Sequence, residues 1–552
     1  MRLNSIRRAL ARLGKEEEGF TMIAVIGAVA TISLLVVGAV WATTSDQKLI
    51  TRDLNQKLAY AAAQAGIADY TYHLNNDNGY WTRCTNVPAP NALNLAGSTA
   101  NRRPVPGSTD GSTYAIELVP ATGQSACSSA SPTATMLESS GPNIGTFRIR
   151  STGYSGPAKA SIVATFKQAT FLDYVYFTQL ETSDPVTYGY ANPSSSLNAA
   201  YDQCTKFRRD GRPRAGTTSP SAICDTIVFV DGDHIEGPVH TNDDICDSPG
   251  DAPTFGRNAA DVIEVSAPPT GYHSSSNSGN GCTGSAPKPS PGTFTTNAPV
   301  LTPPTTNTSL KTFAGPTYTY TGQTRITLSG TNMSINGGSF VSIPSSGVVY
   351  VQNGAGCGPS SYSPFTVTYP SSSGCGNAIV HTSGSYSGQL TIAAENDIII
   401  DDDIVRSGAG LLGLVANNFI RVKHPVCEST DLSCSNGTYT EQAGKGDCDK
   451  DNDRNQAVDG TGTRDDLRID AALLAIDHSF IVDHYDCGDR LGTLTVNGAI
   501  AQKFRGAVGT VGNTGYIKDY NYDDRLRYQE PPHFFDPVQS AWHVQRETLD
   551  FP

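Results

Sequence analysis

The feature that most constrains this chain is an uncharged apolar run from Phe20 to about Ala42. As a helix, about 23 residues extend roughly 34 Å, which is enough to cross the hydrocarbon core of a bilayer. The run is preceded by basic residues, namely Arg2, Arg7, Arg8, Arg12 and Lys15. Because basic flanks stay on the cytoplasmic side, we expect a cytoplasmic N-terminus and an ectodomain in the periplasm or outside the cell.

Three interpretations of residues 1–42 follow. A cleaved secretory signal normally has an apolar core of about 7–15 residues, so this core is too long. A plain transmembrane anchor agrees with the length alone. The third rests on Gly19-Phe20-Thr21, which follows Lys15 and three glutamates at the start of the run. This junction resembles the cleavage site of a type IV prepilin. The resemblance implies a leader of residues 1–19, cleavage by a prepilin peptidase between Gly19 and Phe20, and N-methylation of the new terminus.

An amphipathic segment continues beyond the apolar run. Apolar residues recur at spacings of four and three, which places them on one face of a helix. They are Ile50, Leu54, Leu58, Ala61, Ala65, Ala68 and Tyr72. We predict one helix over residues 20–75, about 55 residues or roughly 80 Å long, ending at a turn-rich stretch. The resemblance makes it a pilin spine, which contacts membrane lipid and other pilin subunits.

One position departs from the pilin pattern. Most pilins carry a glutamate at the fifth position of the mature chain, where it pairs with the N-terminal amine of a neighbouring subunit. Here that position is Ala24. A carboxylate buried in an apolar filament core needs such a partner, and Ala24 offers no carboxylate. We therefore expect a minor pilin or tip pseudopilin, because so large a chain would also crowd a filament built from it alone.

Length, charge and cysteine content set further bounds. A chain of 552 residues is long enough for two to four domains. Its net charge of −13 argues against a nucleic-acid-binding surface. All 12 cysteines follow the apolar run and none forms a CxxC motif, which favours disulfides in an oxidising exterior over zinc or redox chemistry. Sequence does not fix connectivity, but local pairing favours Cys204–Cys224 and Cys357–Cys375.

Residues 76–170 predict a small antiparallel sheet packed on the spine. Polar and apolar residues alternate over residues 113–119, 146–150 and 161–166. Gly-rich turns separate the last two segments, which is typical of strands joined in hairpins with one buried face. An Ala-rich helix leading into such a sheet resembles the head of PilX-type minor pilins.

The rest of the chain predicts a β-rich ectodomain. Residues 171–265 form a β-rich segment and residues 266–310 a Ser-, Pro- and Thr-rich linker. Over residues 311–510, short β-rich segments recur without helices between them, which favours a right-handed parallel β-helix, with a β-sandwich as the alternative. An acidic insertion spans residues 427–466, and the tail, residues 511–552, is expected to cap the solenoid end. The fold class is mainly β with one long N-terminal α-helix.

The acidic insertion is the first candidate for a metal site. Alternating carboxylates suit Ca²⁺, which binds several oxygens of a tight loop. They are Asp447, Asp449, Asp451 and Asp453. An EF-hand needs glycine and glutamate at its sixth and twelfth positions, which here are Asn452 and Val458. A solvated acidic loop is the alternative, so no cofactor is certain.

Two other clusters give weaker signals. Five residues either converge on a metal or bond to their own turn backbone: Asp231, Asp233, His234, His240 and Asp243. The run Asp401–Asp403 with Arg406 resembles the acidic residues and arginine of β-helix pectate lyases. The sequence contains no GxSxG, P-loop or HExxH motif, so we expect no enzymatic activity.

Together these patterns predict a processed minor pilin or pseudopilin of a type IV pilus-like machine. Its β-rich ectodomain would serve assembly or surface adhesion, with an unknown surface ligand and no nucleic acid. Two alternatives stay open. One is an envelope-anchored structural or adhesive β-helix protein without a pilus. The other is a surface enzyme that acts on polysaccharides.

Overall fold

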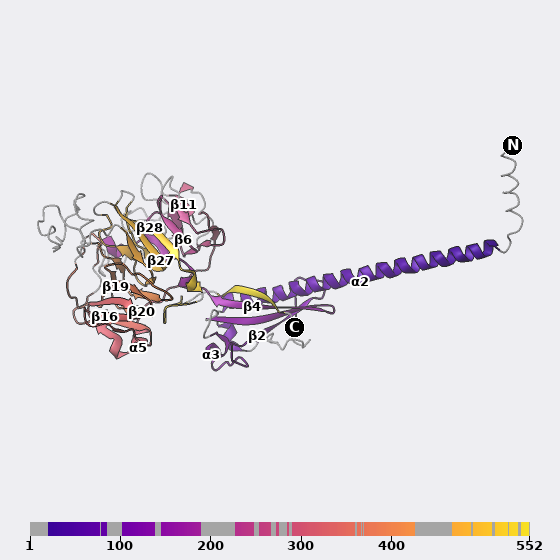
Figure 1. Cartoon of the computed structure of the whole chain (residues 1–552), viewed down its shortest axis with the longest axis horizontal. Helices are drawn as coiled ribbons and strands as arrows, with labels where there is room; N and C mark the ends of the chain where they lie inside the picture. Colours follow the sequence, from indigo (N-terminus) through magenta and orange to yellow (C-terminus); the bar gives the residue numbers. More distant parts are fainter. Residues whose placement is uncertain are drawn as a thin grey trace. The chain divides into compact units, whose positions relative to one another are not determined.

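The computed structural model divides the chain into two compact units (Figure 1). The first contains the described residues up to Glu138, Thr146–Lys167 and those from Val544, and the second contains Gly145 and the described residues of Gln168–His543. The structure describes residues 20–77, 79–84, 102–138, 145–188, 227–247, 253–266, 272–274, 284–285, 290–358, 362–365, 367, 369–424, 466–486, 490–510, 514–527, 529–538 and 542–550.

The first unit is built on one long helix, α2 (Phe20–Asn76), of 57 residues. Its N-terminal half is the apolar run, and its C-terminal half packs on a five-stranded sheet (Figure 1). The strand order is β1 (Arg103–Pro104), β2 (Thr113–Val119), β3 (Thr146–Ser155), β4 (Ala158–Gln168) and β29 (Trp542–Asp550). The short helices η1 (Tyr80–Arg83) and α3 (Pro132–Met136) complete the unit.

The helix and sheet of this unit contact each other very closely. A Cβ atom added to Gly153 of β3 would lie 2.0 Å from the carbonyl oxygen of Ala59. The Ser151 hydroxyl also donates a hydrogen bond of 2.7 Å to the carbonyl of Ala63. Small residues on both surfaces therefore let the two backbones approach, as in other close helix packings.

The face of α2 that packs on the sheet differs from the predicted stripe. The residues that face the sheet are Ala59, Ala62, Ala63, Gly66, Ile67, Tyr70 and Leu74. The predicted stripe is wrong for Ile50, Leu54 and Tyr72, which are 66%, 53% and 66% exposed. The prediction followed the spacing of apolar residues, whereas the short distance to β3 selects the helix face that carries small residues over most of the contact.

The second unit is a β-helix of parallel strands, so the β-sandwich alternative is excluded. Its first row of strands is, in spatial order, β13 (Thr293–Thr296), β10 (Val262–Val265), β7 (Val239–Thr241), β5 (Tyr176–Ser183), β27 (Arg490–Arg505), β25 (Ala472–Ala475), β22 (Leu411–Ala416), β20 (Gln389–Ala394), β18 (Val348–Gln352) and β14 (Thr319–Thr321). Every neighbouring pair in this row is parallel.

Two further rows complete the coils. The second is β26 (Phe480–Val482), β23 (Ile420–Val422), β21 (Ile398–Ile400), β19 (Ala378–Tyr386), β15 (Thr324–Gly330), β16 (Asn332–Ile335) and β17 (Val341–Ser342). The third is β24 (Leu467–Ile469), the first half of β27, β28 (Gly515–Tyr522), β6 (His234–Glu236) and β9 (Thr254–Phe255). A separate three-stranded sheet contains β8 (Ile245–Asp247), β11 (Tyr272–Ser274) and β12 (Gly284–Ser285).

The core of the β-helix consists of apolar residues stacked in register. One interior row runs through Val349, Ile392, Leu414, Leu473, Ile500, Tyr176, Val239, Ile263 and Phe294. Each fully buried side chain of this kind stabilises the fold by about 1.5–3 kcal/mol. Because the row continues from Ile500 to Tyr176, the two β-rich parts of the sequence share one core.

The chain builds this unit as two arms that meet in the middle. The first arm runs from β5 through β7 and β10 to β13, and the second runs from β14 back to β27, which pairs with β5. Residues 266–310 are therefore not a linker. They contain strands, and the buried side chain of Asn307 donates hydrogen bonds to the carbonyls of Ala394 and Val415. A short polar side chain in this segment forms hydrogen bonds to neighbouring coils, and the composition of the segment does not reveal that role.

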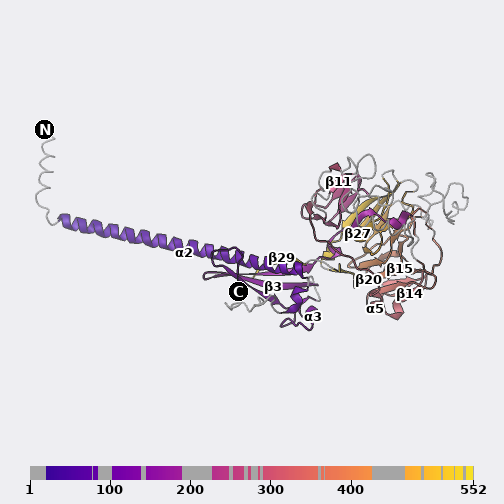
Figure 2. The ribbon, with the colours of Figure 1, turned by 180° about the vertical axis from the view of Figure 1, so that it is seen from behind.

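The C-terminal tail also differs from the predicted cap. Strand β28 lies between β27 and β6, and residues 529–538 cover the outer side of the first row. There, a Cβ on Gly413 would lie 2.8 Å from the Phe534 ring. The last strand, β29, joins the small sheet beside β4, so the whole β-helix is inserted between two neighbouring strands of the first unit (Figure 2). Strands β4 and β29 are far apart in the sequence, so no local sequence pattern predicts that they pair.

Candidate functional site

The apolar half of α2 is the most conspicuous surface of the first unit. The segment Met22–Trp41 has a mean hydropathy of 2.6, and none of it is buried. Within the part of the chain that the structure describes, no other helix is long and apolar enough to cross a membrane. Large side chains such as Leu34, Leu35 and Trp41 are exposed. A patch of this size needs lipid or other helices to cover it.

A second apolar surface continues along α2 beyond the membrane-length segment. We call Ile50, Leu54, Ala61, Ala68 and Tyr72 the exposed apolar stripe. The close contact with β3 covers a different set of helix residues, so the exposed stripe has no cover from its own unit. Apolar residues at helical spacing that face solvent are typical of helices that pack against another helix.

The predicted cleavage site lies at the start of α2. Phe20 is the first residue of the helix, whereas Gly19 lies outside the described residues. Ala24 lies in the first turns of the helix, where it is exposed. Its methyl group therefore adds to the apolar surface of the helix and carries no charge.

Of the two predicted cysteine pairs, the structure describes one. Cys357 and Cys375 form a disulfide with Cα atoms 4.6 Å apart, whereas Cys204 and Cys224 lie outside the described residues. A second disulfide, Cys84–Cys127, joins segments that are 43 positions apart. No other cysteine lies between these two in the sequence, so pairing of neighbouring cysteines also indicates this disulfide.

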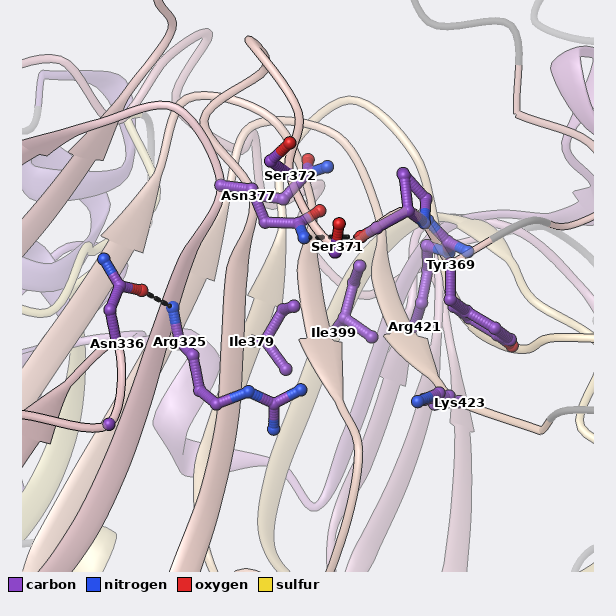
Figure 3. A pocket seen from close by; sticks show the side chains of 13 residues that line it. Arg325, Asn336, Tyr369, Ser371, Ser372, Asn377, Ile379, Ile399, Arg421 and Lys423 are labelled. Carbon is purple, nitrogen blue, oxygen red and sulfur yellow. Dashed lines mark hydrogen bonds between the residues drawn. The ribbon is translucent and has the colours of Figure 1, made fainter. Parts of the chain in front are cut away.

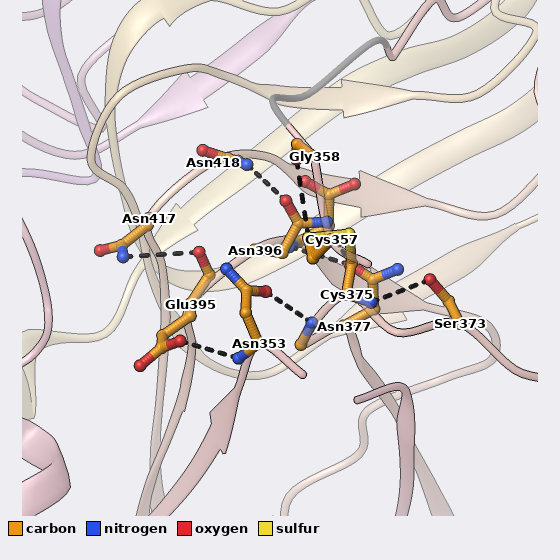
Figure 4. Close-up of a disulfide and its surroundings, with 12 residues drawn as sticks. Asn353, Cys357, Gly358, Ser373, Cys375, Asn377, Glu395, Asn396, Asn417 and Asn418 are labelled. Carbon is orange, nitrogen blue, oxygen red and sulfur yellow. Dashed lines mark hydrogen bonds between the residues drawn. A yellow bond between two sulfur atoms is a disulfide. The ribbon is translucent and has the colours of Figure 1, made fainter. Parts of the chain in front are cut away.

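The Cys357–Cys375 disulfide lies beside a ladder of asparagines at the coil corners (Figure 4). The Asn418 side chain donates a hydrogen bond to the Asn396 side chain, which in turn donates one to Asn377. Each of these residues comes from a different coil, so the ladder satisfies polar groups where the chain turns between two rows. The disulfide closes the loop that leads into this corner.

The acidic cluster that resembled pectate lyases is divided between two networks. Asp401 pairs with Arg325, and its carboxylate lies 2.8 Å from Nδ1 of His381. Burial raises the pKa of Asp401, but the His381 and Arg325 contacts outweigh it and hold the pKa below its ordinary value. Arg406 instead pairs with Asp523 at 2.7 Å. The arginine of the predicted cluster therefore has a different carboxylate partner from Asp401.

The other predicted metal residues do not converge either. Asp233 pairs with Lys518, and His240 lies 3.0 Å from Glu264. Asp243 accepts a hydrogen bond from the backbone of Glu181. Among the described residues, no group of three or more potential ligands is arranged to hold a metal ion. The proposed Ca²⁺ residues Asp447, Asp449, Asp451 and Asp453 lie outside the described residues.

Comparisons with known proteins give only weak similarity. No protein-family model and no curated protein sequence matches this chain. Among solved structures, the chain is similar to the competence-associated pilin ComZ from Thermus thermophilus, with 12% identity and a TM-score of 0.26. That alignment covers 90% of this chain and 98% of the other. Similarity of this strength carries no argument about function.

Proposed function

We propose that this chain is a minor pilin or pseudopilin of a type IV pilus-like machine, cleaved by a prepilin peptidase between Gly19 and Phe20. The observation that carries the proposal is the division of α2 into two halves. One half is entirely exposed and apolar, and the other packs a small antiparallel sheet while leaving the exposed apolar stripe uncovered. Such a helix suits a subunit that lies first in a membrane and later among other helices.

The exposed apolar stripe supports assembly over simple anchoring. A membrane anchor needs an apolar surface only across the bilayer, about 20 residues of helix. Here apolar residues remain exposed from Met22 to Tyr72, well beyond that length. Neighbouring subunit helices would cover the part outside the membrane, whereas lipid would cover only the first part.

The absence of a carboxylate at Ala24 supports a subunit of low abundance. Without it, this chain cannot form the ion pair that aligns successive major pilins, so it joins the filament at a special position. The β-helix would then be displayed outside the membrane, with the N-terminus in the cytoplasm. We also propose that the ectodomain binds a surface ligand and catalyses no reaction.

The test of cleavage is the N-terminus of the protein taken from its own cells. Mass spectrometry of the wild type should find a chain that begins at N-methylated Phe20, and Gly19→Ala should retain the leader. The matched control is Gly27→Ala, because a Cβ there meets no atom within 4 Å and it lies outside the cleavage junction. A wild-type chain that begins at Met1 would reject the proposal in favour of a plain anchor.

The non-enzymatic part has a separate test. The full chain is incubated with acidic polysaccharides, with and without Ca²⁺, and the products are analysed by size. We expect no shortening of the polymer. Cleavage that Asp402→Ala abolishes would show instead that the ectodomain is an enzyme.

A further inference from the structure

A lysine lies in the interior of the β-helix, on strand β28. Side chains at alternate positions of this strand are buried, and Lys518 shares that pattern with Tyr520 and Tyr522. Its ammonium lies 2.6 Å from Oδ2 of Asp233, which comes directly before β6, the strand that pairs with β28. The Lys518 and Asp233 side chains are 9% and 1% exposed. An amine and a carboxyl group from positions 285 apart in the sequence are therefore enclosed together.

The surroundings of Lys518 disfavour its charged form. Among the described residues, Asp233 supplies the only hydrogen-bond acceptor for an ammonium that has three N–H donors. A second cation, the Arg505 guanidinium, lies against the same Phe229 ring. Burial lowers the pKa of Lys518, and with the positive charge of Arg505 it outweighs the attraction of Asp233. The neutral amine, which is the nucleophilic form, is therefore more accessible than in an ordinary lysine.

Arg421 shows how this β-helix buries a cation that stays charged. Arg421 lines a cavity beside the second row of strands (Figure 3). Its guanidinium pairs with Asp397 at 3.1 Å and with Asp483 at 3.0 Å. Burial lowers the pKa of Arg421, but the carboxylates around it outweigh burial and raise the pKa. Lys518, with a single carboxylate, shows the opposite shift, so its environment is not that of a fully compensated ion pair.

Asp233 is held in an orientation that suits attack by the amine. Its Oδ2 accepts a hydrogen bond of 3.0 Å from the Val230 backbone N–H, and its Oδ1 accepts one of 3.4 Å from the Lys518 backbone N–H. Because Nζ lies 2.6 Å from Oδ2, it lies roughly 3–3.5 Å from Cγ, the separation of a near-attack arrangement. The N–H beside Oδ1 stabilises the negative charge that develops there during attack.

We propose that Lys518 and Asp233 form an intramolecular amide bond. The ammonium passes one proton to Oδ2 along their hydrogen bond, which leaves a neutral amine and a neutral carboxyl group. The Nζ lone pair attacks Cγ, a second proton passes from Nζ to the Oδ2 hydroxyl group, and that group leaves as water. One C–N bond forms and one C–O bond breaks, so the step needs no oxidant, reductant or other reactant. Because the core excludes water, the reverse hydrolysis is disfavoured.

The amide bond joins the two arms of the β-helix covalently. Strand β6 belongs to the first arm, and β28 follows the last strand of the second arm. Without the bond, the contact of β28 with β6 consists of hydrogen bonds and packing, which separate when the chain unfolds. The inference goes beyond the proposed function and does not depend on leader cleavage, so either can fail while the other stands.

The experiment is mass spectrometry of the full chain, purified in detergent, then denatured and reduced. We expect a mass lower by one water molecule than the mass of the sequence counted from the observed N-terminus. A trypsin digest should contain a branched peptide in which Lys518 is joined to Asp233, and trypsin should not cleave after Lys518. A wild-type chain in which trypsin cleaves after Lys518 and no branched peptide forms would overturn the proposal.

The digest also separates the amide bond from another loss of water. The neighbouring Asp231 precedes Gly232, and its side chain can close on its own backbone. That closure lowers the mass by the same amount but joins no two peptides. A mass deficit confined to the peptide that contains Asp231 would therefore overturn the proposal.

Variants assign the bond to its two partners. Lys518→Arg keeps a cation in the core but has no amine for this reaction, and Asp233→Leu removes the carboxyl group. Each should show the full sequence mass and no branched peptide. The matched control, Lys503→Met, removes a lysine whose pair with Asp477 is partly exposed, and it should retain both the mass deficit and the branched peptide. Thermal unfolding shows which variants fold. A mass deficit that persists in Lys518→Arg would overturn the proposal, whichever variants fold.

Discussion

The Arg505 guanidinium donates a hydrogen bond of 3.1 Å to the Glu181 carboxylate, which joins β27 to β5 across 324 positions of sequence. Both side chains are almost fully buried, and the guanidinium lies 3.5 Å above the centre of the Phe229 ring. Burial raises the pKa of Glu181, and the charge of Arg505 opposes that rise. This ion pair lies where the two arms of the β-helix meet.

Arg505→Met should therefore destabilise the β-helix by about 3–5 kcal/mol, because it leaves the Glu181 carboxylate buried without a counter-charge. Adding Glu181→Met should restore part of the loss, since an apolar pair needs no compensation. Chemical unfolding of the full chain measures both. Lys503→Met is the matched control, as its pair with Asp477 is partly exposed and is worth about 1 kcal/mol or less. Equal losses for the two single variants would contradict the argument.

Gly153→Ala should destabilise the first unit by about 2–3 kcal/mol. The added methyl group would lie 2.0 Å from the Ala59 carbonyl oxygen, so helix and sheet must separate. Thermal unfolding and limited proteolysis of the full chain measure the effect. Gly358→Ala is the control, because its Cβ meets no atom within 4 Å. If both variants unfold like the wild type, the close contact of α2 with β3 is not as described.

Leu54→Asp should abolish incorporation into filaments without changing folding. Leu54 belongs to the exposed apolar stripe, so its own unit loses no contact, whereas a carboxylate between packed helices is costly. Immunogold labelling of sheared filaments and thermal unfolding of the purified chain separate the two effects. Gln56→Asp introduces the same charge at an exposed position on the other side of the helix. Normal incorporation of the Leu54 variant would argue against helix packing along this face.

The stability of the β-helix should depend on pH through His424. Burial, with a contribution from His484, lowers the pKa of His424 to about 4. The unfolded chain then binds more protons than the folded chain between about pH 4 and pH 6.5, so stability falls as the pH falls through that window. At pH 5 the loss relative to pH 7.5 is about 2 kcal/mol from this group.

The measurement compares unfolding free energies of the wild type and His424→Gln at pH 5 and pH 7.5. The difference between the two proteins isolates His424, because other buried groups titrate in both. The wild type should lose more stability on acidification than the variant. Identical pH profiles would show that His424 titrates with an ordinary pKa in the folded chain.

Replacing Cys357 and Cys375 together by serine should cost about 3 kcal/mol, as expected for a closed loop of 18 residues. The loop leads into the coil corner that carries the asparagine ladder, so its closure also limits the unfolded chain near that corner. Chemical unfolding of the full chain measures the loss. A stability equal to that of the wild type would mean that the disulfide does not constrain the unfolded chain as a closed loop.

Local patterns in the sequence predict much of the fold. The uncharged run from Phe20 and the alternation in β2, β3 and β4 predict the helix and most of the small sheet. The spacing between Ile398 and Ile420, which are paired in the structure, predicts one coil of the β-helix. In each case the signal lies within a few turns or coils, where periodicity directly reflects which residues are buried.

The remaining features depend on contacts between distant segments. The pairing of β29 with β4 and of β27 with β5 has no local signature. The spacing of apolar residues predicts a different buried face of α2, whereas the close approach of Gly153 makes the face with Ala59 the better fit. The separate pairing of Asp401 with Arg325 and of Arg406 with Asp523 likewise could not be predicted, because these partners lie in distant parts of the sequence.

The position of β29 has a consequence for the order of biogenesis. Strand β4 precedes the β-helix in the chain, yet its partner at the sheet edge, β29, follows the β-helix. Until the chain through β29 has been synthesised, the edge of β4 stays unpaired, and such an edge invites aggregation or degradation. A finished small sheet therefore reports that the β-helix is present, so a copy truncated within the β-helix would be recognisable by its open sheet edge.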